Sequence, residues 1–455
     1  MATLVHEPLV RPAVSAARED LQPPTFVLVG MCLYFAVGGL IPFTNAANNT
    51  ALGGQGVMAE TGGGPSGTLI HLAVIGVALY YAYPFRKQLR ETFLGLPVIL
   101  GLTMWPICTT LWSQSPMTTF KQGLFLIASM LFAVYLGRVV DQGRLLRVLW
   151  IGGTIAAVSS AVLAVLVPRV GIDNHTERGG EWQGIFTGKN VCAMTMLFLL
   201  MPTLMVKPAT PRERALKYVS CFLILGIIVM TQSRTAWLIT IGLLAFSAVL
   251  HLLGRMAPKE RLLVILIMLV VAAALGLAFY AISDQVLALA GRDSSLSGRK
   301  EIWAALWLSI LKRPVLGYGY RAFWLGLTGE SANVIIAIDW VTGYAHNGFL
   351  AVWSELGGVG LVLFLLTFFK GLRDAATCFY LGRPSYVDWY ITTLIFLPIY
   401  NYTEANIMFP FQLIWVLYVV TCVGLDRTAR ERRQMLAAAK SFPAIRANRG
   451  IVKAA

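Results

Sequence analysis

Long apolar runs separated by short polar segments dominate this 455-residue chain. A hydrocarbon core about 30 Å thick needs roughly 20 apolar residues per helix, and runs of this length recur from end to end. They predict an all-α, polytopic membrane fold with about twelve transmembrane helices. A very tight turn is expected between the seventh and eighth. The expected spans begin near residues 23, 68, 92, 118, 148, 191, 218, 236, 262, 346, 388 and 408.

The predicted spans divide the chain into five parts. These are an N-terminal tail (1–22), nine spans (23–283), one large outer loop (284–345), three further spans (346–425) and a basic C-terminal tail (426–455). The N-terminal tail contains several acidic residues and lacks the basic start of a cleavable signal. We therefore expect the first span to be a retained signal anchor.

The composition agrees with a membrane protein and suggests its orientation. With 57% hydrophobic and 13% charged residues, the chain is too apolar for a soluble domain of this length. Of its 37 Lys and Arg residues, only 11 fall in one set of alternate loops, so the positive-inside rule predicts cytoplasmic termini and an outward face for that set. The net charge of +15 then reflects topology and contact with anionic membrane lipids, and nucleic-acid binding explains it poorly. The six cysteines lack paired spacing in an outer loop, so neither a structural disulfide nor a zinc site is expected.

Basic residues on the outer side need another explanation, because orientation disfavours them. Most of them fall in three stretches. They are Lys121, Arg169, Arg178, Lys189, Arg234, Arg292, Arg299, Lys300, Lys312, Arg313 and Arg321.

The first stretch, "NHTERGGEWQGIFTGKN" at 174–190, contains Arg178 and ends where the sixth span begins. Lys189 and Asn190 would lie at a helix N-terminus, where backbone N–H groups and the helix dipole favour an anion. The alternative is a glycine-rich connector with solvated charges. His175 is interpreted as a loop residue.

The second stretch, "MTQSRTAWL" at 230–238, places Ser233 as a cap and Arg234 in the first turn of a helix. A cation at that end opposes the helix dipole, so Arg234 is unfavourable there unless an anion lies opposite. The alternative is an arginine that reaches to lipid headgroups.

The third stretch, "SGRKEIWAALWLSILKRP" at 297–314, predicts an amphipathic helix capped by Ser297, ended by Pro314 and lying in the membrane interface. Arg299 shares its apolar face, and a guanidinium at headgroup depth suits a phosphate partner. Alternatively, the stem of Arg299 packs while its tip reaches water. The glycine–aromatic segment that follows adds Arg321 as a weaker candidate.

His346 and Asn347 open the next span in "TGYAHNGFLAVW", 342–353. In the first turn of a helix the dipole disfavours the imidazolium, which keeps His346 neutral and able to act as a general base. Asn347 or a carbonyl could fix its tautomer. The alternative is a histidine that only marks a water boundary. For Glu355, about 13 Å deeper, we favour a structural hydrogen bond between helices.

The chain has no Asp-x-Asp pair, dense outer carboxylate cluster, Walker motif or Rossmann glycine pattern, so no metal or other cofactor is expected. A neutral base with fixed cations suits attack by a hydroxyl and departure of a phosphorylated group. The arginines would stabilise the diphosphate charge, and the histidine would take the proton.

These segments resemble the O-antigen ligase and polymerase superfamily of bacterial envelope glycosyltransferases. The matching points, in order, are "LWSQSP", "GIFTGKN", "SRTAW", "GRKEIW" in one large outer loop, and "AHNGFL" opening the next span. The resemblance implies a metal-independent, inverting transferase at the periplasmic face of the inner membrane. Its donor would be a polysaccharide on undecaprenyl diphosphate, and its acceptor a sugar hydroxyl of lipid A-core oligosaccharide.

By the same resemblance, His346 corresponds to the family's histidine, and Arg234 and Arg299 to its diphosphate-contacting arginines. Lys189, Asn190, Arg178, Arg321 and Asn347 are added here as substrate-binding candidates from charge and position.

We rank O-antigen ligase first and O-antigen polymerase second, with a protein O-oligosaccharyltransferase of the same superfamily as a further alternative. A transporter for lipid-linked sugars would also bind diphosphate with arginines. Transporters place polar residues near the bilayer midplane in repeated halves, whereas the candidates here gather at the outer surface.

Overall fold

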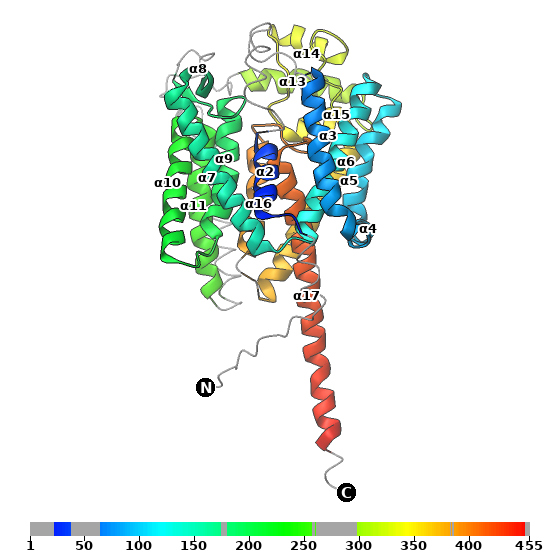
Figure 1. Cartoon of the computed structure of the whole chain (residues 1–455). Helices are drawn as coiled ribbons and strands as arrows, with labels where there is room; N and C mark the ends of the chain where they lie inside the picture. Colours follow the sequence, from blue (N-terminus) through cyan, green and yellow to red (C-terminus); the bar gives the residue numbers. More distant parts are fainter. Residues whose placement is uncertain are drawn as a thin grey trace.

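The structure is a computed structural model that describes residues 22–37, 64–173, 180–256, 260, 298–382, 384 and 386–450. Almost all of its regular structure is helical, with one short antiparallel pair of strands (Figure 1). The elements are α2 (Thr25–Ala36), α3 (Gly64–Ala82), η1 (Tyr83–Phe85), α4 (Arg86–Gly95), α5 (Pro97–Cys108), η2 (Thr109–Leu111), α6 (Pro116–Arg138), α7 (Gln142–Leu166), α8 (Pro168–Gly171), β1 (Ile172–Asp173), β2 (Glu181–Trp182), α9 (Lys189–Met205), α10 (Pro211–Met230), α11 (Arg234–Arg255), α13 (Arg299–Lys312), α14 (Glu330–Ile338), α15 (Gly348–Tyr380), α16 (Val387–Asn401) and α17 (Leu413–Gly450).

The helices agree with the apolar pattern of the sequence. A helix begins near each expected span, except for the span near residue 262, which lies outside the described residues. The tight turn between α10 and α11 is confirmed. Within the described residues, five helices are long and apolar enough to cross a membrane, so the chain is a multi-pass membrane protein. The total of twelve spans and their orientation remain predictions.

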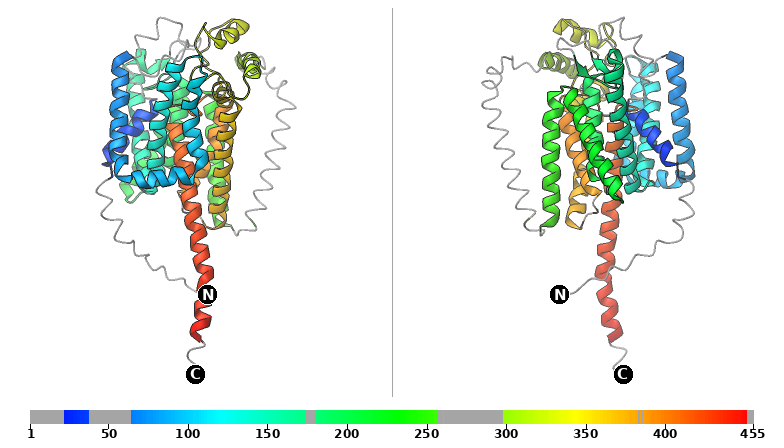
Figure 2. Two further views of the ribbon diagram at one scale, coloured as in Figure 1. Left: turned by 90° about the vertical axis from the view of Figure 1, so that its right-hand side faces the viewer. Right: turned by 60° about the vertical axis from the view of Figure 1, so that its left-hand side comes forward.

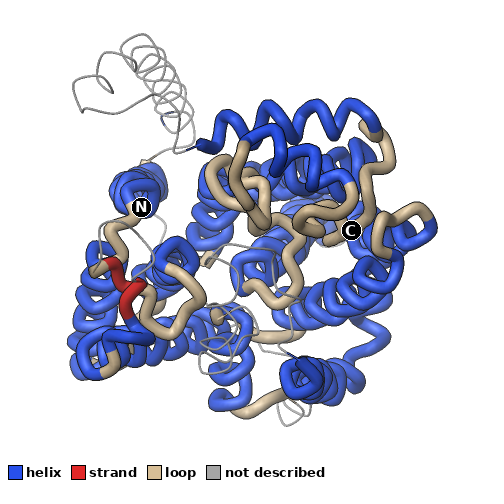
Figure 3. The backbone as a smooth tube through the Cα atoms, turned by 90° about the horizontal axis from the view of Figure 1, so that it is seen from above, coloured by secondary structure: helices blue, strands red, loops and turns tan. Residues whose placement is uncertain are grey.

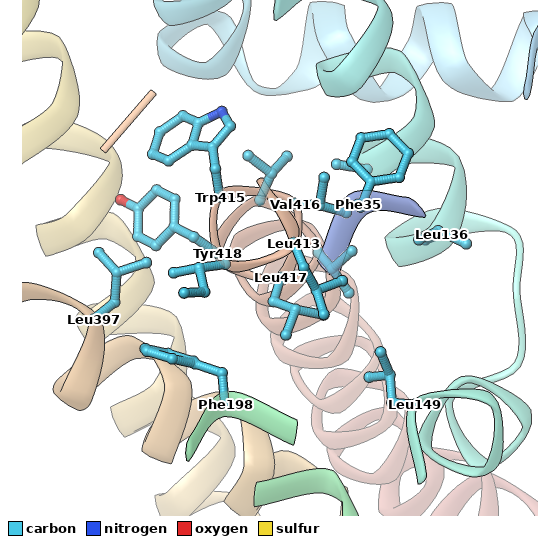
Figure 4. Packing of buried hydrophobic residues seen from close by; sticks show 14 of the residues in the cluster. Phe35, Leu136, Leu149, Phe198, Leu397, Leu413, Trp415, Val416, Leu417 and Tyr418 are labelled. Atoms are coloured by element: carbon cyan, nitrogen blue, oxygen red, sulfur yellow. The ribbon is translucent and has the colours of Figure 1, made fainter. Parts of the chain in front are cut away.

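The core of the bundle forms around the first half of α17. Trp415, Leu417 and Tyr418 are fully buried there, among side chains from α2, α6, α7, α9 and α16 (Figure 4). Small residues let the helices approach closely, as is common in membrane bundles. A Cβ atom on Gly424 would lie 2.2 Å from the Tyr390 Oη.

α17 extends well beyond the other helices at one end of the bundle (Figures 1 and 2). The first part of the expected basic tail, from residue 426 to Gly450, continues this helix. Near the start of that extension, the Lys370 Nζ lies 2.6 Å from carboxylate oxygens of both Asp374 and Asp426, which joins α15 to α17.

The opposite end of the bundle carries α13, α14 and the loops around them (Figure 1). Viewed from above, these short helices and loops lie over the ends of the long helices (Figure 3). Side chains from distant segments meet here, since both Asn190 and Arg299 hydrogen-bond to Glu404. We refer to this end of the bundle, with α13, α14 and the loops around them, as the loop end.

α15 is two helical segments joined at Gly357, whose φ of 69° and ψ of −175° are not helical. The loop from 314 to 321 runs along this break, where the Gly319 N–H donates to the Glu355 carbonyl at 2.9 Å and the Gly358 N–H to the Pro314 carbonyl at 2.8 Å. The second segment, about 23 residues, is about 35 Å long and could cross the hydrocarbon alone. The single span expected from residue 346 is therefore broken at Gly357.

Candidate functional site

The prediction that His346 lies in the first turn of a helix is wrong. It precedes the N-cap residue Asn347, and α15 begins at Gly348. Its φ of 49° is in the left-handed region, which a residue other than glycine seldom adopts. The Asn347 side chain caps the helix instead, accepting from the N–H groups of Phe349 at 3.0 Å and Leu350 at 3.1 Å. The helix dipole is therefore not the cause of a neutral imidazole here.

The surroundings of His346 nevertheless keep its ring uncharged. The residue is 9% exposed, and its ring centroid lies 3.9 Å from that of Tyr344. Burial, helped by the positive charge of Arg299, lowers the pKa of His346 to about 3. Among the described residues its Nδ1 has no hydrogen-bond partner. Asn347 donates to the Tyr402 carbonyl, so the idea that it fixes the His346 tautomer is wrong.

Arg299 is the first residue of α13, and it follows the cap position Gly298, not Ser297, which lies outside the described residues. As expected, it shares a face with apolar residues, since Ile302 and Leu306 are fully buried. That face packs against α14 and α15. The Trp303 Nε1 donates to the Ala345 carbonyl at 2.9 Å and so fixes α13 beside the residue before His346.

The guanidinium of Arg299 pairs with Glu404, a residue that no motif in the sequence indicates. Its Nη2 lies 3.2 Å from the Glu404 Oε1, and both side chains are largely buried. The same oxygen accepts from the Asn190 Nδ2 at 3.2 Å. Burial raises the pKa of Glu404 to about 7, against the lowering influence of Arg299. An acidic residue shortly before the span expected from residue 408 was the available signal.

Lys189 and Asn190 lie at the start of α9, which confirms that prediction. Their side chains contact different acidic residues. Asn190 contacts Glu404 and so belongs to the cluster around Arg299. Lys189 forms an ion pair with the buried carboxylate of Glu181, which belongs to β2. Its positive charge is therefore largely compensated.

Arg234 is the first residue of α11, and its side chain is exposed. Ser233 occupies the cap position, but its side chain makes no capping hydrogen bond. Phe246 of α11 packs against Phe396 of α16, with ring centroids 5.8 Å apart. From this contact, α11 leads back to Arg234 and α16 leads on to the loop that contains Glu404, and both helices reach the loop end there. Arg234 therefore lies at about the same level of the bundle as Glu404. Within the described part of the chain, no ion pair or hydrogen bond joins its side chain to that cluster.

The remaining candidates are spread more widely. Arg321 has a φ of 57°, and its guanidinium carbon lies 3.9 Å from the centroid of the Phe409 ring. Its backbone N–H donates to the Glu355 Oε2 at 2.9 Å, so the expected hydrogen bond of Glu355 joins a loop and not a second helix. Arg178 and His175 lie outside the described residues. Over the described ranges, no group of three or more His, Cys, Asp or Glu side chains could hold a metal ion.

Comparison with known proteins adds independent information about this site. The exopolysaccharide production protein ExoQ of Rhizobium meliloti (strain 1021) is 22% identical to the chain over 383 residues, which are 80% of this chain and 85% of that protein. Residues 219–365 match the family model described as O-antigen ligase. This region includes Arg234, Arg299 and His346, together with the 314–321 loop. The chain therefore carries a domain of the O-antigen ligase family.

Proposed function

We propose that this protein is a glycosyltransferase that moves a polysaccharide from undecaprenyl diphosphate to a sugar hydroxyl of lipid A-core, as an O-antigen ligase does. The observation that supports this most strongly is a buried neutral imidazole, His346, under the influence of the Arg299 guanidinium at the loop end. The match of residues 219–365 to the O-antigen ligase family model supports it independently. The site would face the periplasm from the inner membrane, with both termini in the cytoplasm.

In the proposed reaction, an acceptor hydroxyl attacks the anomeric carbon of the donor glycan. The new C–O bond forms as the bond to the diphosphate breaks, with inversion at that carbon. His346 takes the hydroxyl proton, and the lipid diphosphate leaves as an anion. The Arg299 guanidinium stabilises the developing charge with its planar donor fork.

The low pKa of His346 makes the free ring a weak base. Part of the lowering comes from Arg299, which repels a second positive charge. A diphosphate bound against Arg299 would offset this repulsion and raise the pKa of His346 toward its ordinary range. Binding of the donor would thus increase the basicity of the group that starts the reaction.

Other polar residues would complete the donor site. Asn190 lies in the Arg299 cluster through Glu404 and would donate to a phosphate oxygen. Asn347 would act indirectly, because its cap holds the start of α15 beside His346. Arg234 and Arg321 would contribute positive charge along the path of the lipid-linked glycan. Arg178 stays a candidate from its charge in the sequence alone, and Lys189 would hold Glu181 at the start of α9.

A second candidate is a polymerase, whose acceptor would be another lipid-linked glycan. The similarity to an exopolysaccharide production protein over 85% of that protein's length favours it. Donor, base and diphosphate contacts are the same in both proposals, and only the acceptor differs.

Transfer by purified protein in detergent tests the proposal. The donor is a labelled polysaccharide on undecaprenyl diphosphate, and the acceptor is lipid A-core in one arm and a lipid-linked repeat unit in the other. His346→Asn should lower turnover about 100-fold or more while thermal stability and donor binding persist. His251→Asn, a substitution of an exposed histidine on α11, is the matched control. Turnover of His346→Asn within a few-fold of the unmodified protein would exclude His346 as the base.

A further inference from the structure

An apolar cavity lies beside α4, at the end of the bundle opposite the loop end (Figure 1). Three helices form its walls, through residues 96–99 at the start of α5, Thr367, Lys370 and Gly371 of α15, and Cys422 of α17. The cavity volume is about 160 Å³. Because a cavity of about 150 Å³ can hold a benzene ring, this one has room for several methylene groups.

The walls of this cavity are mainly apolar. Leu96, Val98 and Ile99 contribute hydrocarbon side chains. The Thr367 hydroxyl donates to the Phe364 carbonyl at 2.7 Å, so its hydrogen is already used within α15. An empty space beside apolar side chains lacks the van der Waals contacts of a close-packed interior, and water finds few hydrogen-bond partners there. A hydrocarbon chain is the occupant that such walls favour.

Positive charge lies at the edge of the cavity. The Nζ of Lys370, a wall residue, lies 2.6 Å from the Asp426 Oδ1. The Arg430 Nε lies 2.8 Å from the second oxygen of the same carboxylate, and its Nη2 donates to the Gly95 carbonyl at 3.1 Å. Gly95 directly precedes the wall residues of α5, so Arg430 is fixed beside them. Its side chain is 53% exposed, which leaves it accessible to a ligand.

The cations around this edge outnumber the anions. Asp374 and Asp426 together form ion pairs with four basic side chains, those of Lys370, Arg373, Arg430 and Arg433. Two positive charges are therefore in excess where α15 meets α17. Basic clusters between or beside spans attract the headgroups of anionic lipids.

α4 indicates the level of the cavity in the membrane. Leu89 and Phe93 on one face of α4 are buried, whereas Arg86 and Arg90 are exposed. A short amphipathic helix of this kind lies in the membrane interface. α4 ends at Gly95, and α5 begins two residues later and leads toward the loop end. The cavity thus lies where the headgroup region meets the hydrocarbon.

We propose that this cavity binds one chain of an anionic phospholipid whose phosphate contacts Arg430. The chain fills the space between α5, α15 and α17. The planar donor fork of the Arg430 guanidinium matches phosphate oxygens, and the excess positive charge favours an anionic headgroup over a zwitterionic one. In the proposed orientation this lipid lies in the cytoplasmic leaflet, at the opposite membrane surface from the donor diphosphate. The inference does not depend on the reaction that the protein catalyses.

Native mass spectrometry of the full-length protein tests the headgroup part of this proposal. Dioleoyl phosphatidylglycerol and dioleoyl phosphatidylcholine, which have the same chains, are titrated into protein in a neutral detergent. We expect phosphatidylglycerol to bind about 5-fold more tightly or better. Arg430→Gln should weaken phosphatidylglycerol binding about 5-fold and leave phosphatidylcholine binding unchanged, because it removes one positive charge.

The matched control for the headgroup is Arg212→Gln. Arg212 is an exposed arginine at the start of α10, on the other flank of the bundle from α4 (Figure 1). Its phosphatidylglycerol affinity should equal that of the unmodified protein. Equal affinity of the unmodified protein for the two lipids would overturn the proposal, and so would equal phosphatidylglycerol binding by Arg430→Gln and Arg212→Gln.

Photocrosslinking in nanodiscs tests the chain part. Phosphatidylglycerol with a diazirine in one acyl chain should form adducts on residues 96–99 and 367–371. Val98→Phe fills the cavity and should abolish the adducts on 367–371, whereas Val162→Phe, at an exposed position on α7, should keep them.

Three outcomes of the crosslinking would overturn the proposal. The first is unchanged adducts on 367–371 in Val98→Phe. The second, which needs no variant to fold, is adducts of the unmodified protein spread evenly over its exposed helix faces. The third is loss of these adducts at a lower concentration of undecaprenyl phosphate than of unlabelled phosphatidylglycerol, because the cavity would then hold the polyprenyl chain of the donor.

Discussion

Replacing Glu404 by Gln should change how stability depends on pH, because Glu404 and His346 ionise abnormally in the folded protein. The pKa of His346 falls from 6.5 to about 3 on folding, and that of Glu404 rises from 4.5 to about 7. Both residues are nearly buried, so solvent screens these effects little. The two residues act on stability in opposite directions.

The signs follow from which state binds more protons. Between pH 3 and 6.5 the unfolded chain binds the extra proton at His346, so stability rises with pH by up to about 1.4 kcal/mol per pH unit. Between pH 4.5 and 7 the folded chain binds the extra proton at Glu404, so stability falls with pH at a similar rate. The two contributions cancel between pH 4.5 and 6.5.

Each substitution should expose the other contribution. Relative to the unmodified protein, Glu404→Gln should become more stable with rising pH, by about 3 kcal/mol in total between pH 4.5 and 7. His346→Gln should lose stability relative to the unmodified protein as pH rises from 4.5 to 6.5. All other titrating groups are shared, so the differences between variants isolate these two residues.

The assay is denaturant unfolding in detergent micelles at several pH values across this range. Glu301→Gln removes an exposed carboxylate from the same helix as Arg299 and serves as the control. Its profile should run parallel to that of the unmodified protein. Parallel profiles for Glu404→Gln and the unmodified protein would mean that Glu404 ionises normally in the folded protein, contrary to this prediction. A parallel profile for His346→Gln would mean that the ring is not held neutral.

Three further predictions concern the donor site and its support. Arg299→Lys should lower kcat/KM for the donor at least about 10-fold, because an ammonium does not reproduce a bidentate fork, and full activity would show that charge alone suffices. Arg234→Gln should change the free energy of unfolding by no more than about 0.5 kcal/mol, because its side chain is exposed, and should raise the donor KM. An unchanged donor KM would leave Arg234 as a lipid-contacting residue. Gly319→Ala should destabilise by about 2 kcal/mol in unfolding measurements, because its φ is 105° and a Cβ would lie 2.3 Å from the Ser113 Oγ, whereas near-native stability would mean that the 314–321 loop can shift.

Local sequence signals predicted the parts of this structure that depend on local physics. Apolar run length gave the starts of the helices, and residue order placed Lys189 and Arg234 at helix N-termini. The three- and four-residue spacing in 299–310 correctly put Arg299 on a buried face. These features depend only on neighbours within a turn or two.

Features that depend on distant contacts were missed. Glu404 is about 100 positions from Arg299, and no periodicity indicates that the two side chains meet. The break at Gly357 is hidden in an apolar run that otherwise favours one continuous helix. His346 has a left-handed backbone and precedes the N-cap Asn347, so the expected first-turn position was wrong. Its pKa is lowered by burial and by the distant Arg299, so a neutral ring was predicted for a different physical reason.

A structure with undecaprenyl diphosphate bound would show whether Arg299 holds the leaving group. We expect phosphate oxygens about 3 Å from the Arg299 guanidinium, with Glu404 displaced from it and the His346 ring facing the sugar end of the diphosphate. A diphosphate held elsewhere, with Arg299 still paired to Glu404, would exclude this role.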